Sequence, residues 1–153
     1  SYRSLTHIAA PVRKAFYLKD LVNDSVTIAQ TNWPSASVSY HELSEDIILY
    51  ADFGQISQVM NNLIKNAVQA GASEIDITAF IDKRERTVIN VANNGEPISE
   101  TGKEQIFVPF YTTKGASGTG VGLSLCRQII RLNGGTINLT SSTAESTVFT
   151  IVL

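Results

Sequence analysis

Residues 107–125 of this 153-residue chain read Phe-Val-Pro-Phe-Tyr-Thr-Thr-Lys-Gly-Ala-Ser-Gly-Thr-Gly-Val-Gly-Leu-Ser-Leu. A helical pattern of apolar residues starts within the stretch, near Gly120, and ends at Gly134 and Gly135. Glycine lets backbone amide groups come close to a ligand, and a helix N-terminus presents unpaired amide groups with partial positive charge. The stretch therefore predicts either a polyphosphate-binding loop that leads into a helix, or a plain surface loop before a core helix.

Composition and motif pattern exclude several classes of function. The formal net charge of −2 gives no electrostatic attraction to nucleic acid or an anionic membrane, and no apolar run approaches the length of a membrane span. The single cysteine, Cys126, rules out an internal disulfide, and its apolar surroundings predict a small core residue. The glycine loop lacks the Gly-Lys-Ser/Thr of a Walker loop, and no strand runs directly into it as in a dinucleotide fingerprint.

Residues 53–70 predict an amphipathic helix with an unusual polar face. Its apolar residues recur at helical spacing: Phe53, Ile56, Met60, Leu63, Ile64 and Ala67. The opposite stripe is made of amides: Gln55, Gln58, Asn62, Asn66 and Gln69. Because Asn62 and Asn66 are four apart, their oxygens lie on one side of the helix and could bind a hard cation or a ligand. A buried amide network explains the same stripe equally well.

The remaining pattern predicts one α+β domain. We expect a helix at 19–31, and then two short strands, 38–42 and 47–51, around an acidic turn. A hairpin of 74–81 with 88–92, a helical turn at 101–105 and a closing hairpin of 136–140 with 147–153 complete the elements. This order predicts a mostly antiparallel sheet with helices on one face. His7 is interpreted as an exposed histidine.

Three segments in order carry a resemblance to a known family. They are Gln-Val-Met-Asn-Asn-Leu-Ile-Lys-Asn-Ala at 58–67, Val-Ala-Asn-Asn-Gly-Glu-Pro-Ile at 91–98, and the glycine-rich stretch with the preceding Ile106. They resemble the asparagine box, the first glycine box, the phenylalanine box and the second glycine box of the ATP-binding catalytic domain of bacterial sensor histidine kinases. That domain belongs to the superfamily of histidine kinases, gyrase, chaperones and mismatch-repair ATPases. The resemblance covers residues 16–153.

The resemblance implies a two-layer α/β sandwich of the Bergerat type, with a mixed, mostly antiparallel sheet covered on one face by about three helices. ATP is expected between the helical layer and a lid formed by residues 107–119. Residues 1–15 are expected to be the linker from a missing dimerisation and phosphoacceptor domain, and residues 16–153 the ATP-binding catalytic domain.

The resemblance also assigns roles to individual residues. It implies that Asn66 binds Mg²⁺, that Asn62 supports the phosphates, and that Lys114 is a cation over the γ-phosphate, so these three are the candidate catalytic residues. The expected ATP-binding residues are Asn66, Asn93, Gly95, Thr112, Thr113, Lys114, Gly118, Thr119, Gly120, Val121, Gly122 and Leu123.

The sequence departs from the family pattern at several positions. ATP-hydrolysing relatives carry a glutamate at the place of Asn62, and an amide cannot act as a base, so this residue favours transfer to a protein histidine over hydrolysis. The family usually has an Asp at the place of Asn93, and Asn loses charge assistance to the adenine amino group, about 1 kcal/mol in a buried site. Pro97 replaces a glycine and stiffens that loop. Gln69 replaces a basic residue, so Lys114 or Lys65 must supply positive charge.

The resemblance, together with Asn62, implies a protein-histidine kinase domain that transfers the γ-phosphate of Mg-ATP to a histidine outside this chain. The expected partners are the helical dimerisation and phosphoacceptor domain and, indirectly, a response regulator, with no nucleic acid and no direct membrane contact. The expected location is the cytoplasmic part of a membrane-anchored bacterial sensor. Two alternatives stay open: a nucleotide-binding regulatory module without catalysis, suggested by Asn93 and Gln69, and an ATPase or serine kinase of the same superfamily.

Overall fold

The computed structural model describes residues 7–109 and 122–153 of the chain. In chain order the elements are β1 (Lys14–Tyr17), α2 (Leu18–Asn32), β2 (Ser37–Glu42), β3 (Ile48–Ala51), α3 (Phe53–Gln69), β4 (Glu74–Ile81), β5 (Thr87–Asn93), α4 (Glu100–Gln105), α5 (Gly122–Leu132), β6 (Thr136–Ser142) and β7 (Thr147–Val152). Within these described residues, no helix is both long and apolar enough to cross a bilayer.

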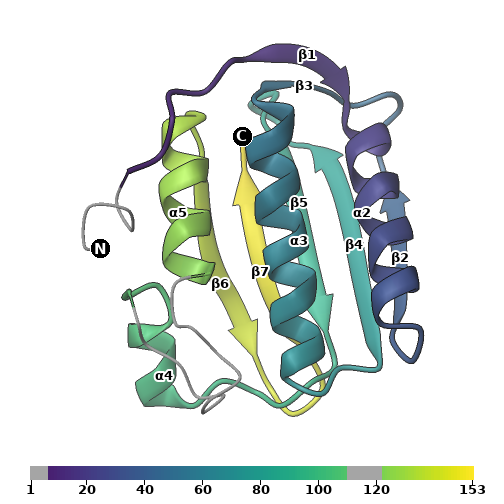
Figure 1. Cartoon of the computed structure of the whole chain (residues 1–153), viewed down its shortest axis with the longest axis vertical. Coiled ribbons are helices and arrows are strands. Elements are labelled where there is room, and N and C mark those ends of the chain that lie inside the picture. The colour runs from purple at the N-terminus through teal and green to yellow at the C-terminus, as the bar shows by residue number, and fades with distance from the viewer. Residues whose placement is uncertain (1–6, 110–121) are drawn as a thin grey trace.

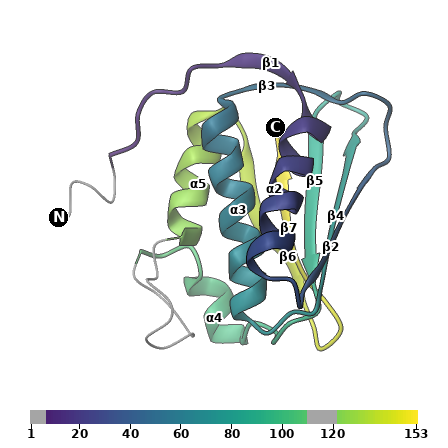
Figure 2. The same ribbon diagram turned by 45° about the vertical axis from the view of Figure 1, so that its right-hand side comes forward.

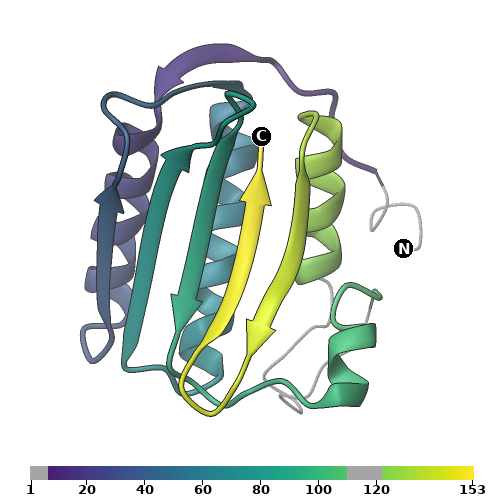
Figure 3. The same ribbon diagram turned by 180° about the vertical axis from the view of Figure 1, so that it is seen from behind.

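The described elements form two layers (Figure 1). Five described strands make the main sheet in the order β2-β4-β5-β7-β6, in which β2 runs parallel to β4 and the other neighbours are antiparallel. Helices α2, α3 and α5 cover one face, and the view from behind shows the strands of the other face uncovered (Figure 3). The predicted two-layer sandwich with a mixed, mostly antiparallel sheet is confirmed.

Apolar side chains that alternate along the strands and recur at helical spacing along α3 fill the space between the two layers. The strands contribute buried side chains that include Ile75, Ile77, Ile89 and Phe149, and α3 contributes Ile56, Met60, Leu63 and Ile64. These positions agree with the apolar face predicted for residues 53–70, because residues three and four apart share one side of a helix. Phe53 is the exception. It is 39% exposed and packs edge-on against Phe16, with the ring centroids 5.0 Å apart.

The two strands predicted around the acidic turn exist, but they do not pair with each other. Strand β2 pairs in parallel with β4, whereas β3 pairs antiparallel with β1 in a separate two-stranded sheet. The intervening loop is held by Glu42, whose Oε1 accepts the Ile47 backbone N–H at 3.0 Å, and it passes through a positive φ of 45° at Asp46. This loop carries the chain out of the main sheet, where β1 provides the partner that β3 needs.

The segment before β1 lies against the ends of α3 and α5. Asp52 Oδ2 accepts the Val12 N–H at 2.9 Å, and Gln55 Nε2 donates to the Ala9 carbonyl at 2.8 Å. Arg13 donates to the Leu132 carbonyl at 2.7 Å. These bonds attach residues 9–13 to the two-layer fold, while the division of the chain at residue 15 stays a prediction.

Asp52 joins this segment to α3 with both carboxylate oxygens. Oδ1 caps the helix by accepting the Gln55 N–H at 3.0 Å, while Oδ2 accepts from Val12. The bonds from Val12 and then Gln55 hold the pKa of the Asp52 carboxyl below its usual value. A depressed folded-state pKa means that the carboxylate stabilises the fold fully above the unfolded pKa of about 4, and that this contribution is lost as the pH falls through the lower folded value.

We therefore expect Asp52→Ala to lower the free energy of unfolding by about 1–2 kcal/mol at pH 7. The variant should also lose less stability than the wild type between pH 5 and pH 3, because it no longer carries this titrating group. Urea unfolding at the three pH values measures both effects, with Asp24→Ala, at an exposed position of α2, as the control. An unchanged pH dependence in Asp52→Ala would contradict the assignment.

Candidate nucleotide-binding site

Helix α3 places Asn62 and Asn66 half-buried, one turn apart, on the side that carries the amide stripe. The amides of this stripe make different contacts at the start and in the middle of the helix. At the start of the helix it forms an amide network, because Gln55 Oε1 accepts from Asn133 Nδ2 at 2.9 Å and Asn133 Oδ1 accepts the Asp52 N–H at 2.9 Å. The amide-network interpretation therefore holds for Gln55.

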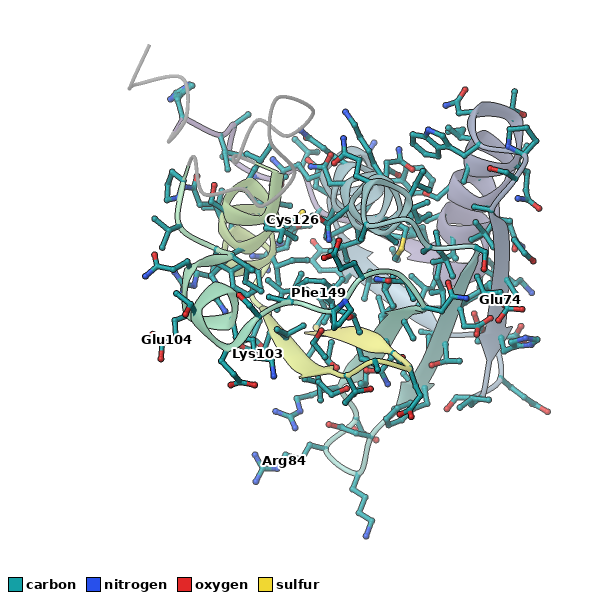
Figure 4. The ribbon with its side chains drawn as sticks, turned by 90° about the horizontal axis from the view of Figure 1, so that it is seen from below. Glu74, Arg84, Lys103, Glu104, Cys126 and Phe149 are labelled. Carbon is teal, nitrogen blue, oxygen red and sulfur yellow. The ribbon has the colours of Figure 1, made fainter. Side chains whose placement is uncertain are left out.

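In the middle of α3, the Asn62 side chain faces α5. Burial raises the pKa of the Cys126 thiol to about 12, while a hydrogen bond from the Asn62 side chain acts in the opposite direction. The Cys126 sulfur also lies 3.9 Å from the Val59 carbonyl oxygen. Figure 4 shows Cys126 directed into the interior beside the helices. The predicted core role of Cys126 is confirmed, and a fully buried thiol with a raised pKa is chemically inert.

The end of β5 lies against the C-terminal end of α3. Asn93 is the last residue of β5 and only 5% exposed, and its Oδ1 accepts the Gly95 N–H at 2.8 Å. A Cβ at Gly95 would lie 2.8 Å from the Ala70 carbonyl oxygen, and the Glu96 N–H donates to that same oxygen at 2.7 Å. Only glycine fits this contact without movement of the backbone. The contact places Asn93 at the end of α3 that carries Asn66.

Helix α5 runs in the opposite direction to α3, so its N-terminus points toward the end of the molecule where α3 finishes (Figure 2). Gly122 and Leu123 form its first turn, so their backbone amide groups belong to a helix N-terminus, which favours anions. The predicted start of this helix near Gly120 falls outside the described residues. Its predicted end at Gly134 and Gly135 is confirmed, because the two amide groups bond to the Arg131 and Ile130 carbonyls at 3.0 and 2.9 Å.

Arg127 is a residue that sequence reasoning missed. Its guanidinium lies 3.7 Å from the centroid of the Phe107 ring and donates to the Ile137 carbonyl at 2.9 Å and to Asn138 Oδ1 at 3.0 Å. Phe107 in turn packs edge-on against Phe149 at 6.2 Å between centroids. Arg127 therefore joins α5 to β6 and to the start of the phenylalanine segment. An arginine in the middle of this amphipathic helix was the available signal, but its aromatic partner lies twenty residues earlier.

The described candidate residues lie in the second half of α3, at the end of β5 and just after it, and in the first turn of α5. These are Asn62, Asn66, Asn93, Gly95, Gly122 and Leu123. The remaining candidates lie outside the described residues: Thr112, Thr113, Lys114, Gly118, Thr119, Gly120 and Val121. Lys65, the alternative cation, is exposed on α3.

The donor set at this end is neutral. Among residues 7–109 and 122–153 there is no group of three or more His, Cys, Asp or Glu side chains that could hold a metal ion. Mg²⁺ at nucleotide sites keeps several waters and shares the phosphate oxygens of its substrate, so a single amide oxygen on α3 would suffice as a protein ligand. The amides and the α5 N-terminus fit such a cation carried in by a polyphosphate.

Comparison with known proteins agrees with this geometry. The family described as "Histidine kinase-, DNA gyrase B-, and HSP90-like ATPase" matches residues 51–153. The sensor histidine kinase ZraS of Escherichia coli (strain K12) is 32% identical over 152 residues, which are 97% of this chain and 32% of that protein. The chain spans about a third of the length of this relative and of the ZraS kinases of two Salmonella strains, to which it is 31% identical.

Solved structures give the same result. The catalytic domain of the histidine kinase ThkA superposes with a TM-score of 0.81 at 33% identity, covering 92% of this chain and 94% of that one. ThkA in complex with the response regulator protein TrrA matches with a TM-score of 0.76 at 30% identity, over 92% of this chain and 41% of that chain. The chain therefore belongs to the family of histidine kinase-, DNA gyrase B- and HSP90-like ATPases, and within it to the ATP-binding catalytic domains of histidine kinases.

Proposed function

We propose that this chain binds Mg-ATP and transfers the γ-phosphate to a histidine on a separate helical dimerisation domain, as the catalytic part of a two-component sensor kinase. One observation carries the choice of transfer over hydrolysis. At the position where hydrolysing relatives have a glutamate, this chain has Asn62, a neutral amide that hydrogen-bonds to the Cys126 thiol. Such a side chain cannot take a proton from water.

The other residues would bind and orient the nucleotide. Asn66 would contribute its amide oxygen to Mg²⁺, which when bound bridges phosphate oxygens and neutralises their charge. Gly122 and Leu123 would donate backbone N–H groups to the phosphates. Asn93 would accept from the adenine amino group through the second lone pair of an oxygen that already accepts from Gly95. Lys114 and the other candidates between 112 and 121 remain assigned to the phosphates by the resemblance alone.

The acceptor histidine would approach the γ-phosphate from outside this chain. The alignment of the reacting atoms would then depend on how the two domains meet, since catalysis of phosphoryl transfer is mainly positioning and charge stabilisation. After transfer, the phosphate would pass to a response regulator, a role supported by the ThkA complex with TrrA. Because ATP is the substrate, the domain would work on the cytoplasmic side of a sensor.

The test is to incubate the intact kinase with γ-labelled ATP and Mg²⁺ and to look for an acid-labile, base-stable phosphoprotein. We expect phosphohistidine in the intact protein and almost none in this chain alone. Nucleotide binding without any phosphohistidine would favour the second candidate, a regulatory module, which Asn93 supports because it weakens adenine recognition. Steady hydrolysis of ATP by the domain alone would favour an ATPase.

Asn93→Asp tests how this site recognises adenine. One carboxylate oxygen can keep the Gly95 N–H bond while the other accepts from the adenine amino group with full charge, so we expect about tenfold tighter ATP binding. The unliganded domain should lose stability, because the new carboxylate is buried. Calorimetric titration with a non-hydrolysable ATP analogue measures the first effect and thermal unfolding the second. GTP, which lacks this amino group, is the control and should gain nothing.

A further inference from the structure

The small sheet of β1 and β3 carries an exposed apolar face. Its outward side chains include Tyr17, Ile48 and Tyr50, which are 46%, 57% and 66% exposed. Tyr17 lies directly opposite Ile48 in the antiparallel register, and Tyr50 lies opposite the small, exposed Ala15. We call Tyr17, Ile48 and Tyr50 the β1–β3 patch. Three large apolar side chains on one small sheet form a contiguous surface and not scattered single residues.

The sequence of β3 differs from that of a strand with one solvated face. It reads Ile-Leu-Tyr-Ala, with Leu49 and Ala51 buried against the helices and Ile48 and Tyr50 directed outward. A strand that is apolar on both faces is typical of a strand covered on both faces. The start of β4 in the main sheet shows the ordinary alternation, because Glu74 and Asp76 are exposed while Ile75 and Ile77 are buried. The β1–β3 patch therefore has the composition of a surface that a partner covers.

The position of the patch limits what that partner is. The patch lies at the end of the molecule where α3 begins (Figure 1), whereas Asn66 is near the other end of this 17-residue helix. A helix of that length spans roughly 25 Å, so a partner on the patch leaves the nucleotide end free. Residues 9–13 are fixed beside the patch by Asp52, Gln55 and Leu132, so a domain joined through this segment is tethered next to it at high effective concentration.

The charges beside the patch give the partner's chemistry. Arg13 and Lys14 are exposed at the start of β1, and Lys19 lies over the Tyr17 ring at 5.3 Å while pairing with Asp46. A complementary partner presents an apolar stripe with carboxylates along the side that faces Arg13 and Lys14. A solvent-facing helix of a dimeric bundle supplies such a stripe at i, i+3, i+4 spacing.

We propose that Tyr17, Ile48 and Tyr50 form the docking surface for the helical dimerisation and phosphoacceptor domain of the same kinase. The proposal rests on the proposed function, which places those helices outside this chain, and the curated relatives extend well beyond the part that this chain matches. The docked helix lies across β1 and β3, with aromatic anchors at Tyr17 and Tyr50, because tyrosine is among the residue types enriched at the energetic centres of interfaces. This docking holds the catalytic domain by the end where α3 begins, so that the opposite, nucleotide-binding end is free to face the acceptor histidine.

The test identifies the occupant directly. Tyr50 is replaced in the intact kinase by the photoreactive residue p-benzoylphenylalanine, the protein is irradiated, and the crosslinked peptide is mapped by mass spectrometry. We expect the crosslink on a helix of the dimerisation domain. Ile28, which is 47% exposed on α2 away from the small sheet, is the matched control position and should give no such crosslink. A crosslink from Tyr50 to the sensor region or to a second catalytic domain, or none at all, overturns the proposal.

A second variant separates docking from nucleotide chemistry. Tyr50→Glu in the intact kinase removes an aromatic anchor and places a carboxylate against the expected apolar stripe, so we expect the rate of histidine phosphorylation at saturating ATP to fall about tenfold with the ATP dissociation constant unchanged. Ile28→Glu should leave both quantities at the wild-type value. An unchanged rate in Tyr50→Glu overturns the proposed docking surface. A wild-type kinase that forms no phosphohistidine overturns the proposed function instead, and docking is then measured by the crosslink alone.

Discussion

Asn66→Ala is expected to lower the rate of phosphohistidine formation by about a hundredfold or more, because it removes the one protein oxygen assigned to Mg²⁺. The described part of the site offers no carboxylate cluster that could take over the metal. The loss should appear in both nucleotide affinity and rate, since the cation positions the phosphates as well as neutralising them. Calorimetry with and without Mg²⁺ and the labelled-ATP assay on the intact kinase measure the two quantities.

Two variants control this result. Gln58→Ala removes an exposed amide from the same stripe two turns earlier and should leave activity unchanged. Asn66→Asp keeps an oxygen ligand of similar shape and should retain more Mg²⁺-dependent binding than Asn66→Ala. Thermal unfolding must show all three variants folded. Wild-type activity in a folded Asn66→Ala protein would remove the metal assignment.

The elements that were predicted from sequence are those whose pattern is local. The helix at 53–70 and the hairpin of β4 and β5 follow from apolar spacing within a few residues, and both appear with nearly the predicted bounds. The strand β1 was not predicted, because a four-residue segment next to a helix acquires its role from β3, more than thirty residues later. The parallel pairing of β2 with β4 also depends on a distant partner and not on the adjacent strand.

For the candidate site, too, the sequence indicated the residues but not their distant contacts. Asn62 and Asn66 stand out in the sequence because an amide stripe is an unusual choice for a solvated helix face. What each amide contacts was beyond sequence reasoning, because the partners are distant. Gln55 bonds to Asn133, 78 positions later, and Asn62 meets Cys126 across the helix pair. The bond between Asn93 and Gly95 likewise depends on the contact of Gly95 with Ala70.

The glycines show why residue type alone does not separate structural from functional roles. Gly134 and Gly135 were predicted to end α5, and Gly134 does so with a positive φ of 88°, which only glycine adopts without strain. Gly135 has a different role. A Cβ there would lie 2.2 Å from the Val152 carbonyl oxygen and 2.6 Å from Leu153 Cδ2. The absence of a side chain at Gly135 is what lets α5 return to the sheet beside β7.

Gly135→Ala should therefore lower the free energy of unfolding by about 3 kcal/mol, near the upper end of the range for overpacking. The oxygen that blocks the Cβ belongs to the backbone of β7, and the Gly135 N–H is already bonded to the Ile130 carbonyl at 2.9 Å, so neither side can move freely. For a domain of this size the melting temperature should fall by roughly 6–12 °C.

The matched control for this substitution is Gly54→Ala in the first turn of α3. Its nearest contact would be Asp52 Oδ1 at 3.5 Å, an ordinary van der Waals distance, and alanine favours the helix, so stability should stay the same or rise. Urea and thermal unfolding of the two variants measure the difference. Equal stability of Gly135→Ala and Gly54→Ala would show that the turn after α5 adjusts at little cost. In that case the close approach of Gly135 to β7 would not determine the position of α5 on the sheet. The position of the helix N-terminus that is predicted to bind phosphate would then depend on other contacts.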